Sequence, residues 1–136
     1  GQDGFQTGTE ARFEGCSAIL NGVNGFVAGG SCVLIGNHAS RNGAAVANGA
    51  GIFVPSNATR VQLDRNTVVS NDFGIKIDSA TNLVTANRAT SNGVNFEIIA
   101  GNRVGSIVTL PIAGPISGSA GGSAVGAADP ISNLAY

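Results

Sequence analysis

Apolar residues recur along the chain with a period of about 21 residues. In each unit a glycine or asparagine precedes one apolar residue, and a second apolar residue follows eight to eleven places later. The first series is Phe5, Phe26, Ile52, Ile75 and Phe96, and the second is Phe13, Leu34, Leu63, Val84 and Val104. Self-similarity at this period is typical of a solenoid, whose units bury their apolar faces by stacking on their neighbours.

Asparagines keep a constant place in the same repeat. One asparagine lies three residues after the second apolar position, and another follows five residues later. Cys16 and Asn21 occupy these two positions one unit earlier. Because equivalent residues of a solenoid lie above one another, we expect amide ladders with a structural role. The ladder residues are Asn37, Asn66 and Asn87 in one column, and Asn21, Asn42, Asn71 and Asn92 in the other.

Within a unit, apolar and polar residues alternate, as in Ile75-Lys76-Ile77-Asp78, which is typical of short strands with one buried face. The 21 glycines and 14 asparagines interrupt the chain too often for helices to grow. We therefore expect an all-β chain that forms a parallel β-helix of about five coils, about 24 Å tall.

The repeat resembles that of right-handed parallel β-helix proteins in the pectate-lyase-like superfamily. The resemblance is clearest in Asn66-Thr-Val-Val-Ser-Asn71-Asp-Phe-Gly-Ile75-Lys-Ile77 and in Asn87-Arg-Ala-Thr-Ser-Asn92-Gly-Val-Asn-Phe96-Glu-Ile98, and it covers roughly residues 4–110. That superfamily includes polysaccharide lyases, hydrolases, epimerases and phage tailspikes, so the resemblance implies a right-handed fold and no single activity. The segments 101–105 and 129–136 also resemble the tails of bacterial exported β-helix proteins of unknown role.

The composition changes abruptly near residue 111, to glycine, alanine, serine and proline. We interpret residues 1–110 as the β-helix and residues 111–136 as an extended C-terminal tail for capping or oligomerisation, because the last coil of a solenoid must be covered. Gly4-Phe5 already matches Gly25-Phe26, so the chain begins in mid-coil. We expect a processed product, or a trimmed piece of a longer precursor, that is secreted or on the cell surface of a bacterium.

Charge and hydropathy exclude two classes of partner. The net charge is −1, with seven Lys plus Arg and eight Asp plus Glu, and no basic patch is evident for a nucleic acid. No apolar run approaches the length of a membrane-spanning helix, so we expect no membrane insertion.

No catalytic constellation is evident in the sequence. Lyases of the resembled superfamily use calcium-binding carboxylate clusters with an Arg or Lys base, and its hydrolases use paired aspartates with a nearby His. Neither pattern transfers here, so we expect no catalytic residue, no metal and no cofactor. His38 is expected as a solvated surface residue, and Lys76 and Glu97 as a surface ion pair. The outward-facing candidates for ligand binding are Asp64, Lys76, Asp78 and Glu97.

Two further features of the sequence bear on function. Cys16 and Cys32 are five residues out of register, about 15 Å of extended chain, which predicts buried free thiols rather than a disulfide. The turns at residues 43–50 and 55–59 are longer than their equivalents. Because the first of them carries no titratable side chain, we interpret it as a tolerated insertion or a subunit contact.

Three classes of function remain open. The leading one is a non-catalytic structural or interaction module of an exported or cell-surface protein. The second is a carbohydrate-binding or carbohydrate-active protein, which as an enzyme would be a polysaccharide lyase or glycoside hydrolase. The third is a fragment of a phage-type fibre or tailspike. We also expect a homo-oligomer, because Val27 and Phe53 share an outward column with Lys76 and Glu97, and resemblance to β-helical fibres favours a trimer.

Overall fold

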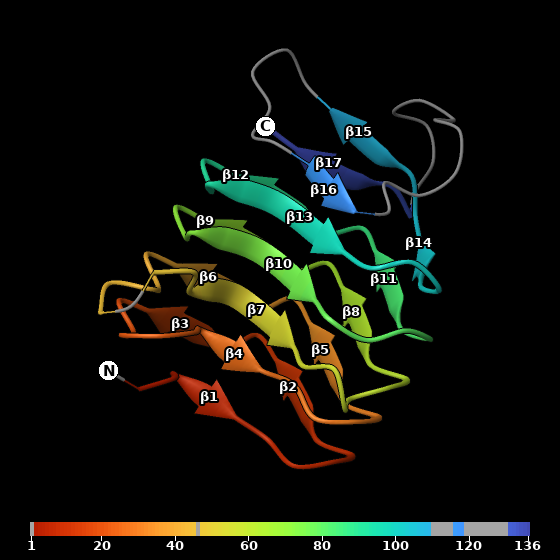
Figure 1. Cartoon of the computed structure of the whole chain (residues 1–136), viewed down its shortest axis with the longest axis horizontal. Helices are drawn as coiled ribbons and strands as arrows, with labels where there is room; N and C mark the ends of the chain where they lie inside the picture. Colours follow the sequence, from red (N-terminus) through yellow and green to blue (C-terminus); the bar gives the residue numbers. More distant parts are fainter. Residues whose placement is uncertain (1, 46, 110–115, 119–130) are drawn as a thin grey trace.

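The chain winds into a stack of flattened coils that rises from the N-terminus to the C-terminus (Figure 1). The structure, a computed structural model, describes residues 2–45, 47–109, 116–118 and 131–136, with the backbone alone for 116–118. In a full coil, one strand is added to each of three parallel sheets. The parallel β-helix predicted from the repeat is confirmed.

The three sheets are named here by their order along a coil. Sheet A contains β1 (Phe5–Gln6), β4 (Phe26–Val27), β7 (Ala50–Val54), β10 (Phe73–Ile77), β13 (Val94–Ile98) and β16 (Ile116–Gly118). Sheet B contains β2 (Arg12–Glu14), β5 (Val33–Ile35), β8 (Gln62–Asp64), β11 (Leu83–Thr85) and β14 (Arg103–Val104). Sheet C contains β3 (Ser17–Ile19), β6 (His38–Ser40), β9 (Thr67–Val69), β12 (Arg88–Thr90), β17 (Asn133–Ala135) and β15 (Ile107–Thr109).

The strand register follows the two apolar series of the sequence. In sheet A, Ile75 pairs with Ile52 on one side and with Phe96 on the other. In sheet B, Leu63 pairs with Leu34 and Val84 in the same way. These residues point inward and are buried, so the core is one continuous column of aliphatic and aromatic side chains.

Sharp corners join the sheets, and up to β14 each contains at least one residue in the left-handed region. At the corner between sheets B and C these residues are Gly15, Gly36, Arg65 and Ala86, with φ from 54° to 64°. The residue that follows each of them points inward, and at Asn37, Asn66 and Asn87 it is a ladder asparagine. Non-glycine residues rarely adopt this conformation, so the coil stacking maintains some backbone strain at Arg65 and Ala86.

The asparagines of the two predicted ladders are hydrogen-bonded in columns with a common polarity. In the column between sheets C and A, the backbone N–H and the Nδ2–H of Asn42 both donate to Oδ1 of Asn71, at 3.0 and 2.9 Å. Asn71 donates to Oδ1 of Asn92 in the same manner, at 2.9 and 3.0 Å. In the column between sheets B and C, Asn37 donates to Asn66, and Asn66 donates to Asn87.

Asn95 ends the column between sheets C and A. Equivalent positions in the earlier coils are glycines, because a Cβ at Gly74 would lie 2.4 Å from the Asn95 carbonyl oxygen and 2.9 Å from Asn92 Nδ2. In the last coil, Asn95 occupies this position, and its Oδ1 accepts from the Nδ2–H of Asn92 at 2.9 Å. The side chain therefore replaces the rung that a further coil would have supplied.

The C-terminal residues enter sheet C as an inner strand, because β17 lies between β12 and β15. The expected cap thus receives a strand from residues 131–136, whereas residues 110–115 and 119–130 of the predicted tail lie outside the described residues. After the longer turn at 43–50 the chain returns to the register of the repeat, because Ala50 pairs with Phe73. Residue 46 of this turn lies outside the described residues.

Both cysteines are free, in agreement with the sequence prediction, but only Cys32 is buried. Cys16 is half-buried, and this corrects the expectation of two buried thiols. The physical reason is its place in the first coil, where none of the described residues covers its lower side.

Among the described residues, no helix is long and apolar enough to cross a membrane.

Candidate functional site

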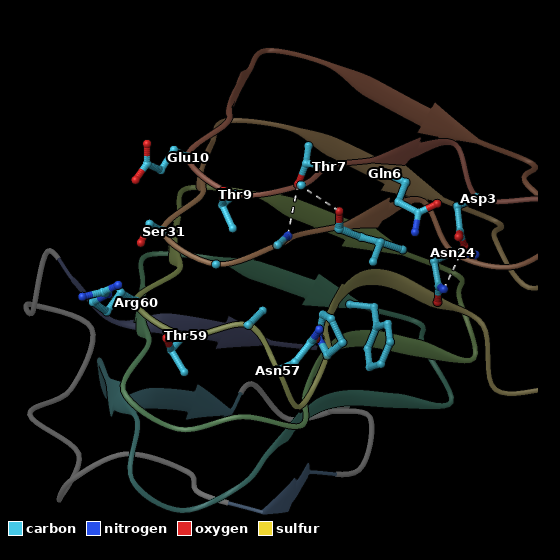
Figure 2. A pocket seen from close by; sticks show the side chains of 17 residues that line it. Asp3, Gln6, Thr7, Thr9, Glu10, Asn24, Ser31, Asn57, Thr59 and Arg60 are labelled. Atoms are coloured by element: carbon cyan, nitrogen blue, oxygen red, sulfur yellow. Dashed lines mark hydrogen bonds between the residues drawn. The ribbon is translucent and has the colours of Figure 1, made fainter.

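A groove of about 660 Å³ crosses the outer surface of the first three coils (Figure 2). It follows the outer face of sheet A and the corners that lead from sheet A to sheet B. Its lining comes from β1, β4, β7 and the segments before and after them: Asp3, Gln6, Thr7, Gly8, Thr9, Glu10, Asn24, Val27, Gly29, Gly30, Ser31, Phe53, Pro55, Asn57, Ala58, Thr59 and Arg60.

An apolar strip on sheet A forms part of this lining. Val27 and Phe53 are paired in register on β4 and β7, and both side chains are half-buried on the outer face of the sheet. Pro55 follows at the end of β7. The strip ends at the next coil, where Lys76 is paired with Phe53. An aromatic ring and a branched side chain thus lie beside the polar groups of the groove.

Hydrogen bonds fix the polar groups at one end of the groove. The backbone N–H and the Nδ2–H of Asn24 both donate to Oδ1 of Asp3, each at 2.9 Å, and Oδ1 of Asn24 accepts from the N–H of Ala50 at 2.8 Å. Oγ1 of Thr7 accepts from the N–H of Gly29 at 3.1 Å. These side chains therefore have defined orientations before any ligand binds.

The other end of the groove carries two opposite charges. Glu10, Ser31 and Arg60 are equivalent residues of successive coils, and all three have left-handed backbones, with φ of 61°, 58° and 59°. Figure 2 shows them together at one end of the groove, away from Asp3 and Asn24. Glu10 and Arg60 are exposed, and neither takes part in the ion pairs found among the described residues. Both charges are available to a ligand.

The four predicted ligand-binding residues lie outside this groove. Three of them are neighbours on the outer face of sheet A, where Lys76 forms an ion pair with Glu97 and lies 3.8 Å from Asp78. The Lys76 ammonium also lies 4.6 Å from the centre of the Phe73 ring. Asp64 is separate from them on sheet B, where it accepts from Thr85 Oγ1 and pairs with Arg65, each at 2.9 Å. Each of the four residues therefore already has an ion-pair partner within the protein.

Sequence reasoning missed the groove because its residues share no motif. Two signals pointed to it: the longer turn at residues 55–59, and the outward apolar pair Val27 and Phe53. From the sequence alone, the turn is an irregularity of the solenoid and the pair is a possible subunit contact. Neither indicated that Thr7, Glu10 and Arg60 meet at the same surface, because that requires knowing which way each corner projects.

Within the described residues, no group of three or more His, Cys, Asp or Glu side chains has the arrangement of a metal site. Comparison of the chain with protein-family models, curated proteins and solved structures finds no significant match.

Proposed function

We propose that the protein is a non-catalytic binding module of an exported or cell-surface protein, and that the groove binds a short segment of a polysaccharide. The observation that carries this proposal is the lining of the groove, in which the Phe53 ring lies among amides and hydroxyls from three successive coils. A sugar ring presents the complementary surface, with an apolar C–H face and hydroxyl groups at its edge.

The dimensions and the polar groups support this class of ligand. A volume of about 660 Å³ lies within the usual range for small-molecule sites, about 300–1,000 Å³. Amides such as Asn57 and Gln6 both donate and accept hydrogen bonds, and the hydroxyls of Thr9 and Thr59 do the same. Groups that combine both roles match sugar hydroxyls, which also combine them.

The charges favour a neutral glycan and binding without catalysis. Among the described residues that line the groove, the carboxylates are Asp3 and Glu10, which lie at its two ends (Figure 2). Asp3 is already engaged by both donors of Asn24. Glycoside hydrolysis requires two carboxylates that flank one bond, about 5–9.5 Å apart. The groove offers a single exposed acid, Glu10, with Arg60 as its neighbouring charge.

A glycan array followed by calorimetry tests the proposal. The wild-type protein should bind one class of neutral oligosaccharide, and Phe53→Ala should weaken that binding about tenfold or more through loss of ring stacking. Leu83→Ala is the matched control, because Leu83 is an outward apolar residue on sheet B, 38% exposed, and lies outside the groove. No binding on the array, or equal binding by the two variants, would contradict a role of the groove.

A further inference from the structure

Strand β17 is held by residues that are distant from it in sequence. The N–H groups of Leu134 and Tyr136 donate to the carbonyl oxygens of Asn87 and Ala89, at 2.8 and 3.0 Å. On the opposite side, the N–H of Asn133 donates to the carbonyl oxygen of Ser106 at 2.7 Å. The strand is thus hydrogen-bonded along both edges, in the manner of a peptide added to a sheet.

The space for this strand arises from a change of level in the last coil. In sheet B, β14 pairs directly with β11, since Arg103 is in register with Leu83. In sheet C, the following strand β15 pairs with β17 rather than with β12. The chain therefore rises by one layer between β14 and β15 and leaves a slot one strand wide.

The slot recognises the sequence Asn-x-Ala. Asn133 and Ala135 are fully buried, and the Nδ2–H groups of Asn133 donate to the carbonyl oxygens of Val84 and Gly105, at 3.2 and 2.8 Å. Leu134 points outward and is in register with Arg88. The same pattern appears one layer below, as Asn87-Arg88-Ala89. A strand that lacks the asparagine would leave buried partners unpaired.

We propose that this slot also accepts the C-terminal strand of a second copy of the chain, so that copies join by exchange of β17. Within the connection from β15 to β17, β16 is paired with β13. Residues 119–130 then lead on toward β17, and 12 residues reach up to about 40 Å when extended, far more than one layer. The exchanged strand makes the same contacts as the resident one. The balance therefore depends on the chain concentration relative to the effective concentration of the tethered strand, about 1 mM.

Disulfide trapping in the full chain tests the exchange. Arg88 and Leu134 are paired neighbours that point outward, and their Cα atoms lie about 4.8 Å apart, within the range that a disulfide spans. Chains with Arg88→Cys and chains with Leu134→Cys are mixed, unfolded, refolded together and oxidised. Peptide mass mapping then counts the linked chains that join position 88 to position 134, and so excludes bonds to the native cysteines.

The linked fraction should rise about tenfold for each tenfold increase in refolding concentration up to about 1 mM. Adding Asn133→Ala to the Leu134→Cys chain should lower it about tenfold or more. Leu83→Cys replaces Arg88→Cys in the control, because position 83 is outward on sheet B of the same coil and should not link to position 134. The double variant Arg88→Cys/Leu134→Cys should close within one chain at low concentration.

Intrachain closure of the double variant without any linked mixture would overturn the exchange. Failure of the double variant to close would overturn the slot itself. Linkage that is insensitive to Asn133→Ala, or that is equal for positions 83 and 88, would overturn recognition of the strand by the slot.

Discussion

Asn87 donates both its backbone N–H and its Nδ2–H to a single atom, Oδ1 of Asn133, at 3.0 and 3.1 Å. The two residues are 46 positions apart in sequence, whereas the ladder pairs below them are 21 or 29 positions apart. The last rung of the ladder therefore comes from the end of the chain, and the ladder joins the C-terminus to the middle of the solenoid.

Asn133→Ala should destabilise the protein by about 2–3 kcal/mol, because two buried donors of Asn87 lose their acceptor. Leu134→Ala should change the stability by less than about 1.5 kcal/mol, since that side chain is only half-buried and points outward. Chemical denaturation of the two variants measures the difference. Equal losses would show that β17 is held by general strand pairing rather than by the asparagine.

Asn71→Ala should destabilise by a similar amount or more, because Asn71 lies in mid-column. It accepts from two donors of Asn42, and its own Nδ2–H donates to Asn92 and to the carbonyl oxygen of Ala39. Lys76→Ala on the outer face removes surface ion pairs and the contact with the Phe73 ring, which contribute about 0–1 kcal/mol each. A thermal melt of Asn71→Ala within error of the parent would contradict the structural role of the ladder.

The repeat predicted the stacking of coils well because each unit carries the same local signals. The apolar series, the asparagine columns, the Lys76 and Glu97 pair and the lack of a disulfide follow from register alone. Register did not reveal the place of Asn133, although Asn133-Leu134-Ala135 repeats the pattern of Asn87-Arg88-Ala89. Asn133 does not follow Asn87 at the spacing of the repeat. It has a place in sheet C only because the chain rises by one layer between β14 and β15 and leaves room for β17.

The candidate site was less predictable than the fold for a similar reason. The sequence predicts that Asp64, Lys76, Asp78 and Glu97 all face outward, but Asp64 lies on sheet B, apart from the other three. The alternation of residues within one strand predicts which side chains face outward. A binding site requires, in addition, that side chains from several corners lie close together. The groove depends on the projection of the turns at 7–10, 29–31 and 55–60, which has no periodic signal in the sequence.

Glycine substitutions at the corner between sheets B and C should have opposite effects. Ala86 holds a φ of 55°, and this conformation costs a non-glycine residue about 1–2 kcal/mol. Ala86→Gly should therefore stabilise by about 0–1 kcal/mol after the larger entropy loss of glycine on folding. Gly36→Ala should destabilise by about 0–1 kcal/mol, since the same strain is partly offset by the smaller entropy loss of alanine, and no atom lies within 4 Å of the added Cβ to add a steric clash. Denaturation midpoints that shift in the same direction for both variants would contradict this account of the corners.

The two thiols should react at different rates with a thiol reagent. Cys32 is 0% exposed, and its Sγ lies 3.3 Å from Thr7 Oγ1 and 3.4 Å from the carbonyl oxygen of Gly8. Cys16 is half-buried in the first coil, where its neighbours cover only one side. We expect one thiol per chain to react in the native state and the second only after unfolding, with Cys16→Ser removing the fast reaction.

Because Cys32 lies beneath the groove wall formed by Thr7 and Gly8, the slow reaction of Cys32 also reports on local opening of that wall. A ligand that fills the groove should slow the reaction of Cys32 further. Two thiols that react at the same rate in the native protein would contradict the packing of the first two coils.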